Sequence, residues 1–388
     1  MKKENTIIPL MVLLLTGCTP TNNISSSTSS ISSISSMTSS ESEATSESET
    51  STTTSEEEKM DITDCNSTEQ IDVYKENGFE PLFVDTNFKK GFRVTKTFYG
   101  EGESPYHDNK KINFYNLYPS SSSYNWTIAQ WSSKYDLMSD NGYSLSKDDT
   151  GLINTITGKG KMVNNKFIPS KQMVFNSITG SIEMTVNSSI EYDTPRTSTD
   201  PWVHLLLENG TPMFKSKEIR LKDFSQIIME ANYTVTKCED KMDGKANSNI
   251  HAAQLVWYVT LQNRNKDSKE YGKYIWFGLN LFDNRSAGKT TTLYNQLDKG
   301  TGTGIYSPGS QTYLNSTNGK IPTVGQKAKA KLNLKSIAEE AFLAGKKQGY
   351  FEATTFDDIY IGGGNFGYEI PGTYDITTVF DSINIFAK

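Results

Sequence analysis

Hydrophobic and polar positions alternate most clearly in residues 251–285, where two strands joined by a long polar loop are predicted. Side chains on a strand point alternately to its two faces, so residues two apart share a face. One face of this hairpin is plain core, formed by Leu255, Trp257, Val259, Leu261, Ile275, Phe277, Leu279 and Leu281. The other mixes aromatic rings with amides and hydroxyls and is formed by Gln254, Val256, Tyr258, Thr260, Gln262, Tyr274, Trp276, Asn280 and Phe282. Such a face can cover a second layer of protein, or it can bind a ligand with flat apolar sides and many hydroxyl groups, such as a sugar.

Further strands are predicted from the same alternation at residues 91–99, 112–117, 172–175, 181–186, 203–207, 226–235 and 378–386. The segments between them are rich in Asn, Gly, Ser and Asp, which favour turns. The three glycines at 362–364 are expected to form such a turn. The last strand is expected to pair near the start of the domain.

One helix is predicted near residue 340. Its apolar residues follow the i, i+3, i+4 spacing of a helix face, namely Leu334, Ile337, Ala338, Ala341 and Phe342. Gly345 suits the C-terminal stop, and we expect the apolar stripe to pack on the outside of a sheet. Many short strands with one or two short helices predict an all-β fold, a β-sandwich.

The N-terminal segment has the form of an export signal. Two lysines precede an apolar run at residues 7–15, which is too short to span a bilayer. The run ends Leu15-Thr16-Gly17-Cys18, which resembles the lipobox of bacterial lipoproteins. That resemblance implies cleavage after residue 17, acylation of Cys18 Sγ, and anchoring of the protein on the outer face of a bacterial membrane.

Residues 18–59 are rich in Ser, Thr and Glu and are predicted to form a disordered tether, because they cannot bury enough apolar surface to fold. Residues 60–388 then form one domain. Three of the 39 basic and eight of the 45 acidic residues precede residue 60, which leaves the domain with 36 and 37. A nearly neutral domain has no field to attract nucleic acid or an anionic bilayer, so we expect membrane contact through the lipid anchor only.

The sequence contains few residues that could bind a metal or form a disulfide. The three histidines are scattered without a zinc motif, and no cofactor is expected. A structural calcium site is conceivable at Asp140, Asn141, Asp148 and Asp149. Cys65 and Cys238 could form a disulfide in an extracytoplasmic compartment, or both could be free thiols.

Two segments carry a resemblance to a known fold family. Gly180 to Glu183 gives a Gly-x-x-Glu strand, and Trp202 leads an apolar strand that ends at Glu208. This is similar to the concanavalin A-like sandwiches of lectins and family-16 glucanases, and it implies a sandwich of jelly-roll or concanavalin A-like type. The glucanase signature Glu-x-Asp-x-(x)-Glu is absent, which counts against a hydrolase of that family.

Candidate catalytic carboxylates are Glu183 and Glu208, with Glu191 and Glu369 as further possibilities. For each glutamate alone, a solvated strand position or a structural salt bridge is the favoured alternative.

The candidate ligand-binding residues are Tyr274, Trp276, Asn280, Asp283, Arg285, Trp202 and His204. Asp283 and Arg285 could instead be an ion pair that fixes a strand end, and His204 a satisfied core histidine. The leading hypothesis is a surface lipoprotein that binds a glycan. The alternatives are a carbohydrate-cleaving enzyme, hydrolase or lyase, and a structural or adhesive surface protein.

Overall fold

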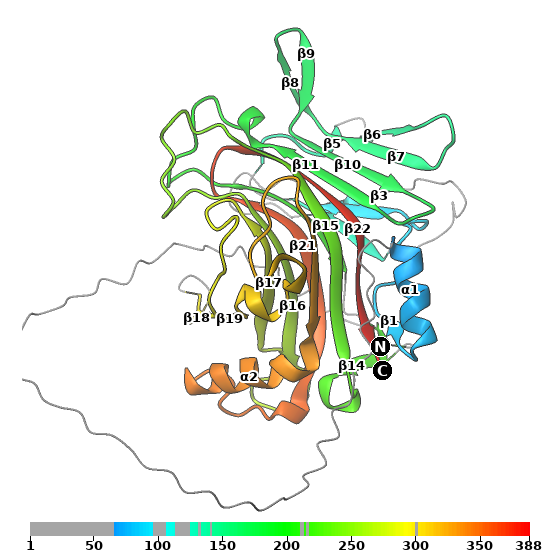
Figure 1. The fold of residues 1–388 in the computed structure, drawn as a ribbon, viewed down its shortest axis with the longest axis vertical. Coiled ribbons are helices and arrows are strands. Elements are labelled where there is room, and N and C mark those ends of the chain that lie inside the picture. Colours follow the sequence, from blue (N-terminus) through cyan, green and yellow to red (C-terminus); the bar gives the residue numbers. More distant parts are fainter. Residues whose placement is uncertain are drawn as a thin grey trace, which may run out of the picture. The chain divides into compact units, whose positions relative to one another are not determined.

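The computed structural model describes residues 66–95, 106–112, 125–130, 133–139, 142–209, 213–214, 217–298 and 302–388 (Figure 1). They form two β-sheets, A and B, that pack face to face around one main hydrophobic core. The predicted all-β sandwich is therefore confirmed. The expected signal peptide, Cys18, the tether, Cys65, Asp140 and Asn141 lie outside the described residues.

Neighbouring strands of sheet A follow the order β20 (Lys327–Asn333), β15 (Ile227–Asp240), β22 (Tyr374–Ala387), β11 (Ile182–Asn187), β10 (Lys171–Asn176), β7 (Ile153–Thr157), β6 (Gly142–Lys147) and β5 (Met138–Ser139). A short strand, β1 (Glu80–Pro81), also pairs with β22. The expectation that the last strand pairs near the start of the domain is thus confirmed. Between β7 and β10, β8 (Gly160–Val163) and β9 (Lys166–Pro169) form a separate two-stranded hairpin.

Sheet B follows the order β18 (Tyr294–Leu297), β19 (Gly304–Ser307), β17 (Tyr274–Asp283), β16 (Gln254–Asn263), β21 (Ile359–Ile370), β12 (Val203–Asn209), β4 (Trp126–Ala129), β2 (Phe92–Thr95) and β3 (Tyr106–Ile112). At its side, β14 (Lys217–Arg220) pairs with β21 and with β13 (Met213–Phe214). Short 3₁₀ turns complete the chain at Ser188–Ile190, Leu221–Asp223, Ser310–Thr312, Asn315–Thr317 and Phe356–Asp358.

The predicted hairpin is β16 paired with β17, and all eight residues of its predicted core face lie in the main core. Phe282 was expected on the mixed face, but it also lies in the core. The pairs Leu255–Phe282 and Val256–Asn280 leave Leu281 unmatched, and this β-bulge rotates Phe282 to the core side.

A second bulge changes the last strand in the same way. In β22, Ser382 pairs with Asn232 and Phe380 pairs with Tyr233, so one residue between them is unmatched. Phe380 therefore lies in the core together with Ile383, rather than on the opposite face as the alternation predicts.

Residues 362–364 do not form the predicted turn, because they lie within strand β21. A Cβ on Gly362 would lie 2.1 Å from Thr260 Oγ1, and one on Gly364 would lie 2.8 Å from the Tyr258 carbonyl oxygen. The glycines are thus strand residues at positions where the neighbouring strand comes too close for a side chain.

The predicted helix near residue 340 is α2 (Leu334–Lys347). Asn333 caps its first turn by accepting a hydrogen bond from the Lys335 backbone N–H at 3.2 Å. Its apolar residues Ala338 and Phe342 join the main core, so α2 closes the core at one end of the strands and does not lie on the outside of a sheet (Figure 1).

A second helix, α1 (Ser67–Glu76), covers the outer face of sheet A. Tyr74 stacks on Phe386 with ring centroids 3.8 Å apart, and its hydroxyl donates to the fully buried carboxylate of Glu230 at 2.7 Å. Lys329 and Lys331 lie 3.7 and 3.8 Å from the same carboxylate, which compensates for its burial. No helix in the described part of the chain is long and apolar enough to cross a membrane.

Candidate functional site

The outer face of sheet B gathers most of the candidate residues, and the strand register arranges them in rows. The first row contains His204 on β12, Glu369 on β21, Gln254 on β16 and Asp283 on β17, each paired with the next. At least one sequence neighbour of each belongs to the main core, so these four side chains share the outer face. Side chains directly opposite each other on neighbouring strands have Cβ atoms about 4.5–5.5 Å apart, so the row is continuous.

Glu369 is the carboxyl group at the centre of this row. It is 7% exposed, and no hydrogen bond or ion pair from another described residue reaches its carboxyl. Burial raises its pKa from 4.5 to about 7, because the charged form loses its hydration. Near neutral pH, Glu369 can therefore donate or accept a proton.

Asp283 is held by its neighbours in the first row. Arg285 Nε donates to its Oδ1 at 2.9 Å, an Arg285 terminal nitrogen donates to its Oδ2 at 2.6 Å, and Gln254 Nε2 donates to Oδ2 at 3.1 Å. The expected ion pair at the strand end is therefore present, in the bidentate form typical of Arg and carboxylate. It leaves Gln254 fixed between two carboxyl groups.

Trp202 and His204 form the other end of the row. The indole Nε1 of Trp202 donates to His204 Nε2 at 2.8 Å, and the guanidinium of Arg196 lies 5.3 Å from the Trp202 ring centroid. Burial lowers the pKa of His204 to about 4, so the imidazole is neutral and its Nε2 can accept this bond. His204 is therefore a buried histidine that accepts a hydrogen bond from the partly exposed Trp202.

Two amide oxygens farther along the same face accept no hydrogen bond from any residue that the structure describes. Asn280 on β17 and Asn365 on β21 lie in the next rows, and the side-chain Oδ1 of each is buried and unpaired among the described residues. A buried acceptor without a donor costs roughly 1–3 kcal/mol, so such groups are uncommon in folded proteins. The hydroxyl groups of a ligand could donate hydrogen bonds to both amide oxygens, because the two lie on one face of the sheet.

Beside them lies a small aromatic and aliphatic cluster, separate from the main core: Ala129, Leu206, Val256, Tyr258, Trp276 and Ile305, with Tyr274 at its edge. The Trp276 ring meets Tyr258 and Tyr274 edge to face, with centroids 5.9 and 5.4 Å apart. Trp276 is only 6% exposed, so most of its ring is covered by protein. Its contact with a ligand stays a prediction, and Tyr274 is the more accessible ring.

Burial raises the pKa of the Tyr258 hydroxyl, and the nearby charge of Glu369 raises it further. Tyr258 lies across Gly278 of the neighbouring strand, where a Cβ would come within 2.0 Å of its ring. The ring thus fills the space that Gly278 leaves.

Glu208 and Glu183 are not brought together. Glu208 lies on β12 on the outer face of sheet B, and burial raises its pKa to about 7 although the nearby Arg93 lowers it. It is four residues from His204, hence roughly 13 Å along the strand from the row of Glu369. Glu183 lies on β11 in sheet A, on the face opposite its core neighbours Ile182 and Met184. Glu183 thus lies on a different sheet from the other two glutamates, and Glu208 lies in a different row from Glu369.

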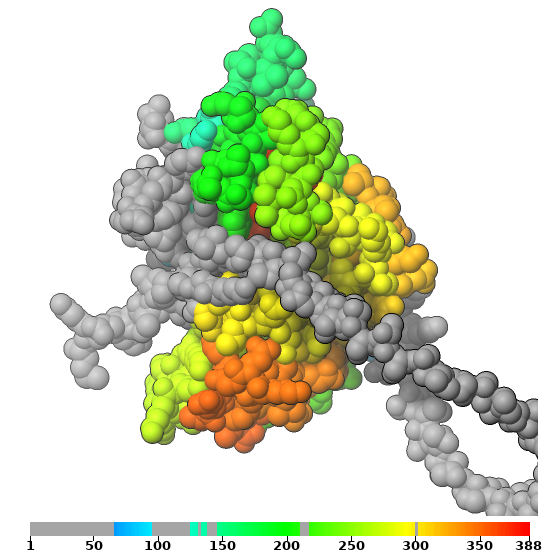
Figure 2. All heavy atoms as spheres, turned by 90° about the vertical axis from the view of Figure 1, so that its left-hand side faces the viewer, coloured from blue at the N-terminus to red at the C-terminus, as the bar shows by residue number. Residues whose placement is uncertain are grey.

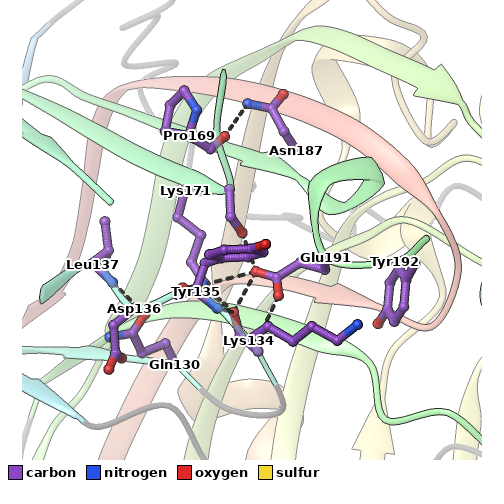
Figure 3. Close-up of polar contacts among 12 residues, drawn as sticks. Gln130, Lys134, Tyr135, Asp136, Leu137, Pro169, Lys171, Asn187, Glu191 and Tyr192 are labelled. Carbon is purple, nitrogen blue, oxygen red and sulfur yellow. Dashed lines mark hydrogen bonds and ion pairs between the residues drawn. The ribbon is translucent and has the colours of Figure 1, made fainter. Parts of the chain in front are cut away.

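Glu191 has a structural role. Its carboxylate accepts hydrogen bonds from Ser133 Oγ at 2.5 Å, from the Lys134 backbone N–H at 2.6 Å and from Ser170 Oγ, and it lies 3.4 Å from Lys171 Nζ (Figure 3). Both charged side chains are fully buried, and burial lowers the pKa of Lys171. This buried ion pair joins the loop at residues 133–137 to sheet A.

The calcium suggestion gains no support from Asp148, because its Oδ1 accepts from the backbone of Leu152 and Ile153 and its Oδ2 from Thr150 Oγ1. Among the described residues, no three His, Cys, Asp or Glu side chains are close enough together to hold a metal ion. Cys238 is half-buried and forms no disulfide with another described residue, and burial raises the pKa of its thiol to about 12. The disulfide with Cys65 stays a prediction.

The sequence alone missed the importance of Gln254 and Asn365. The alternation assigns Gln254 to the mixed face of the hairpin, but nothing in the sequence marks it as a ligand-binding residue. Asn365 and Glu369 share a face by their even spacing, but the predicted turn at residues 362–364 concealed the strand that contains them.

Neither a protein-family model nor a curated protein sequence matches the chain. Several solved structures do. A family 12 xyloglucanase from Bacillus licheniformis has a TM-score of 0.36 and 13% identity over 63% of this chain and 97% of that chain. An endoglucanase from Rhodothermus marinus has a TM-score of 0.34 and 11% identity over 63% and 97%. A metagenome-derived family 12 endoglucanase has a TM-score of 0.33 and 12% identity over 67% and 99%. This distant likeness shows the jelly-roll sandwich fold alone. The solved structures named here include family 12 enzymes, whereas the resemblance noted in the sequence was to family-16 glucanases.

Proposed function

We propose that the outer face of sheet B binds a neutral glycan chain. The observation that carries the proposal is the pair of buried, unpaired amide oxygens of Asn280 and Asn365, which lie on one face with Glu369 and beside Tyr274. Sugar hydroxyls can donate to these oxygens, and an aromatic ring can pack against the apolar face of a sugar. The bidentate pair of Asp283 and Arg285 holds one end of this surface in place.

Binding is favoured over hydrolysis because of what surrounds Glu369. A retaining glycosidase needs two carboxyl groups about 5–5.5 Å apart, which is the separation of directly opposed residues on neighbouring strands. The residues opposite Glu369 are His204 and Gln254, and neither is a carboxylate. An amide therefore occupies the position where a second carboxyl group would complete such a pair.

Inverting hydrolysis is the second candidate. Its carboxyl groups are about 6.5–9.5 Å apart, and Asp283 lies two strands from Glu369, a backbone separation of about 10 Å. Glu369, with its pKa of about 7, would be the general acid, and Asp283 would activate the water. Both carboxylate oxygens of Asp283 already accept hydrogen bonds from Arg285, and Oδ2 accepts another from Gln254, which leaves little room to bind a water molecule. Inverting hydrolysis therefore ranks second.

The test is a glycan array with the chain from residue 18 onward carrying Cys18→Ser, with reducing-end release measured on every bound glycan. We expect binding without release. Asn365→Ala should weaken binding about fivefold, the value of one neutral hydrogen bond, while stability stays the same or rises because an unpaired acceptor is removed.

Asn249→Ala, in an exposed loop, is the matched control and should change neither quantity. Asn365→Ala binding as tightly as the wild type would contradict the assignment of this face. If the wild type releases reducing ends and Glu369→Gln does not, the function is inverting hydrolysis and not binding alone.

A further inference from the structure

The β8–β9 hairpin stands apart from both sheets. Its strands pair only with each other among the described strands, and the hairpin projects beyond sheet A in Figure 1 and at the top of Figure 2. Its turn residues Asn164 and Asn165 have φ values of 49° and 61°, the left-handed pair that a type I′ hairpin turn requires. The two asparagines thus favour one turn conformation at the tip of the hairpin. An isolated two-stranded hairpin is only marginally stable in water.

Large apolar side chains are exposed at this tip. Met162 and Phe167 lie directly opposite each other on one face of the hairpin and are 66% and 47% exposed. Val163, at the turn, is 42% exposed. Single exposed apolar residues are ordinary on protein surfaces, but three within six residues of a projecting hairpin form a contact surface.

The charge around the tip has one sign. Residues 159–170 contain Lys159, Lys161 and Lys166 and no acidic residue. Lys161 Nζ lies 2.9 Å from Asp193 Oδ1, which offsets one of the three charges. Apolar side chains flanked by lysines suit the boundary between the headgroups and acyl chains of an anionic bilayer.

We propose that the β8–β9 hairpin inserts into the interface of an anionic lipid bilayer. Met162, Val163 and Phe167 enter the headgroup region, and Lys166, which is exposed beside the turn, contacts lipid phosphates. The chain between Cys18, the expected lipid anchor, and Asn66 is long enough to span about 38 Å as a random coil, so an anchored domain would remain within reach of the membrane. The hairpin is a second membrane contact beside the anchor, and it shares no residue with the proposed glycan site. This proposal departs from the expectation that the membrane is contacted through the anchor only, because the local charge of residues 159–170 is positive although the net charge of the domain is close to zero.

The experiment is sedimentation of the chain from residue 18 onward, carrying Cys18→Ser so that no acyl chain contributes. Vesicles of mixed phosphatidylglycerol and phosphatidylcholine are compared with vesicles of phosphatidylcholine alone. We expect binding to the anionic vesicles that falls about tenfold in Met162→Ser/Phe167→Ser. Lys166→Gln should weaken binding to anionic vesicles about fivefold and leave the neutral ones unaffected.

Ile178→Ser is the matched control, because this residue is 59% exposed in the turn at the other end of β10. It should bind like the wild type, and all variants should melt like the wild type because the changed side chains are exposed. As a second measurement, Phe167→Trp should increase in fluorescence when anionic vesicles are added. A Met162→Ser/Phe167→Ser variant that sediments as the wild type does would overturn the proposal. So would self-association of the wild type that this double change abolishes, because the hairpin would then bind a second copy of the chain.

Discussion

Replacing Glu369 by Gln should remove a pH dependence of stability that its burial creates. The folded-state pKa is about 7 and the usual value is 4.5, so the folded protein holds this proton more tightly than the unfolded chain does. The penalty of the ionised form is absent below about pH 4.5 and complete above about pH 7. One pKa unit corresponds to about 1.36 kcal/mol, so this group should lower the free energy of unfolding by about 3 kcal/mol across that interval.

The assay is denaturant unfolding of wild type and Glu369→Gln at pH values from about 4.5 to 8. The free energy of the variant minus that of the wild type should rise with pH by about 3 kcal/mol. Glu208, whose pKa burial also raises to about 7, contributes the same trend to both proteins and cancels in the difference.

Glu183→Gln, on the outer face of sheet A, is the matched control, because it removes a carboxyl group at a site far from Glu369. A difference between Glu369→Gln and the wild type that is independent of pH would refute the reasoning. It would show that Glu369 is hydrated or paired in solution.

The remaining predictions concern packing and anchoring. Trp276→Ala should lower the free energy of unfolding by about 3–5 kcal/mol, because it empties a nearly buried position; a loss under about 1 kcal/mol in denaturant titrations would show an open face instead. Lys171→Ala should lower the free energy of unfolding by about 3–5 kcal/mol, because the Glu191 carboxylate is then buried without its cation. The double variant Lys171→Ala/Glu191→Ala should recover part of this loss in denaturant titrations. A double variant that loses as much stability as the sum of the two single changes would contradict the ion pair. Cys18→Ser should abolish labelling by a palmitate analogue, and equal label in both proteins would exclude the lipid anchor. Deletion of residues 19–58 should change the melting temperature by no more than about two degrees, whereas a large drop would show that the segment packs on the domain.

The sequence determined the all-β class, several of the strands and one face of the central hairpin. Residues such as Leu255 and Ile275 repeat every second position because successive side chains of a strand point to opposite faces, so the alternation already assigns them to the core. The stripe that ends at Phe342 predicted α2 for the same kind of reason, since its spacing matches the turn of a helix. The ion pair of Asp283 with Arg285 was also foreseeable, because the two residues are close in the chain.

Only the tertiary structure decided what the other face contains. Glu369 lies opposite Gln254 because β21 inserts between β12 and β16, a pairing between residues more than a hundred positions apart that no local pattern encodes. The bulge beside Phe282 reversed its face, because one unmatched residue shifts the alternation that follows. The raised pKa of Glu369 likewise arises from burial, which depends on the layers that the whole chain assembles around it.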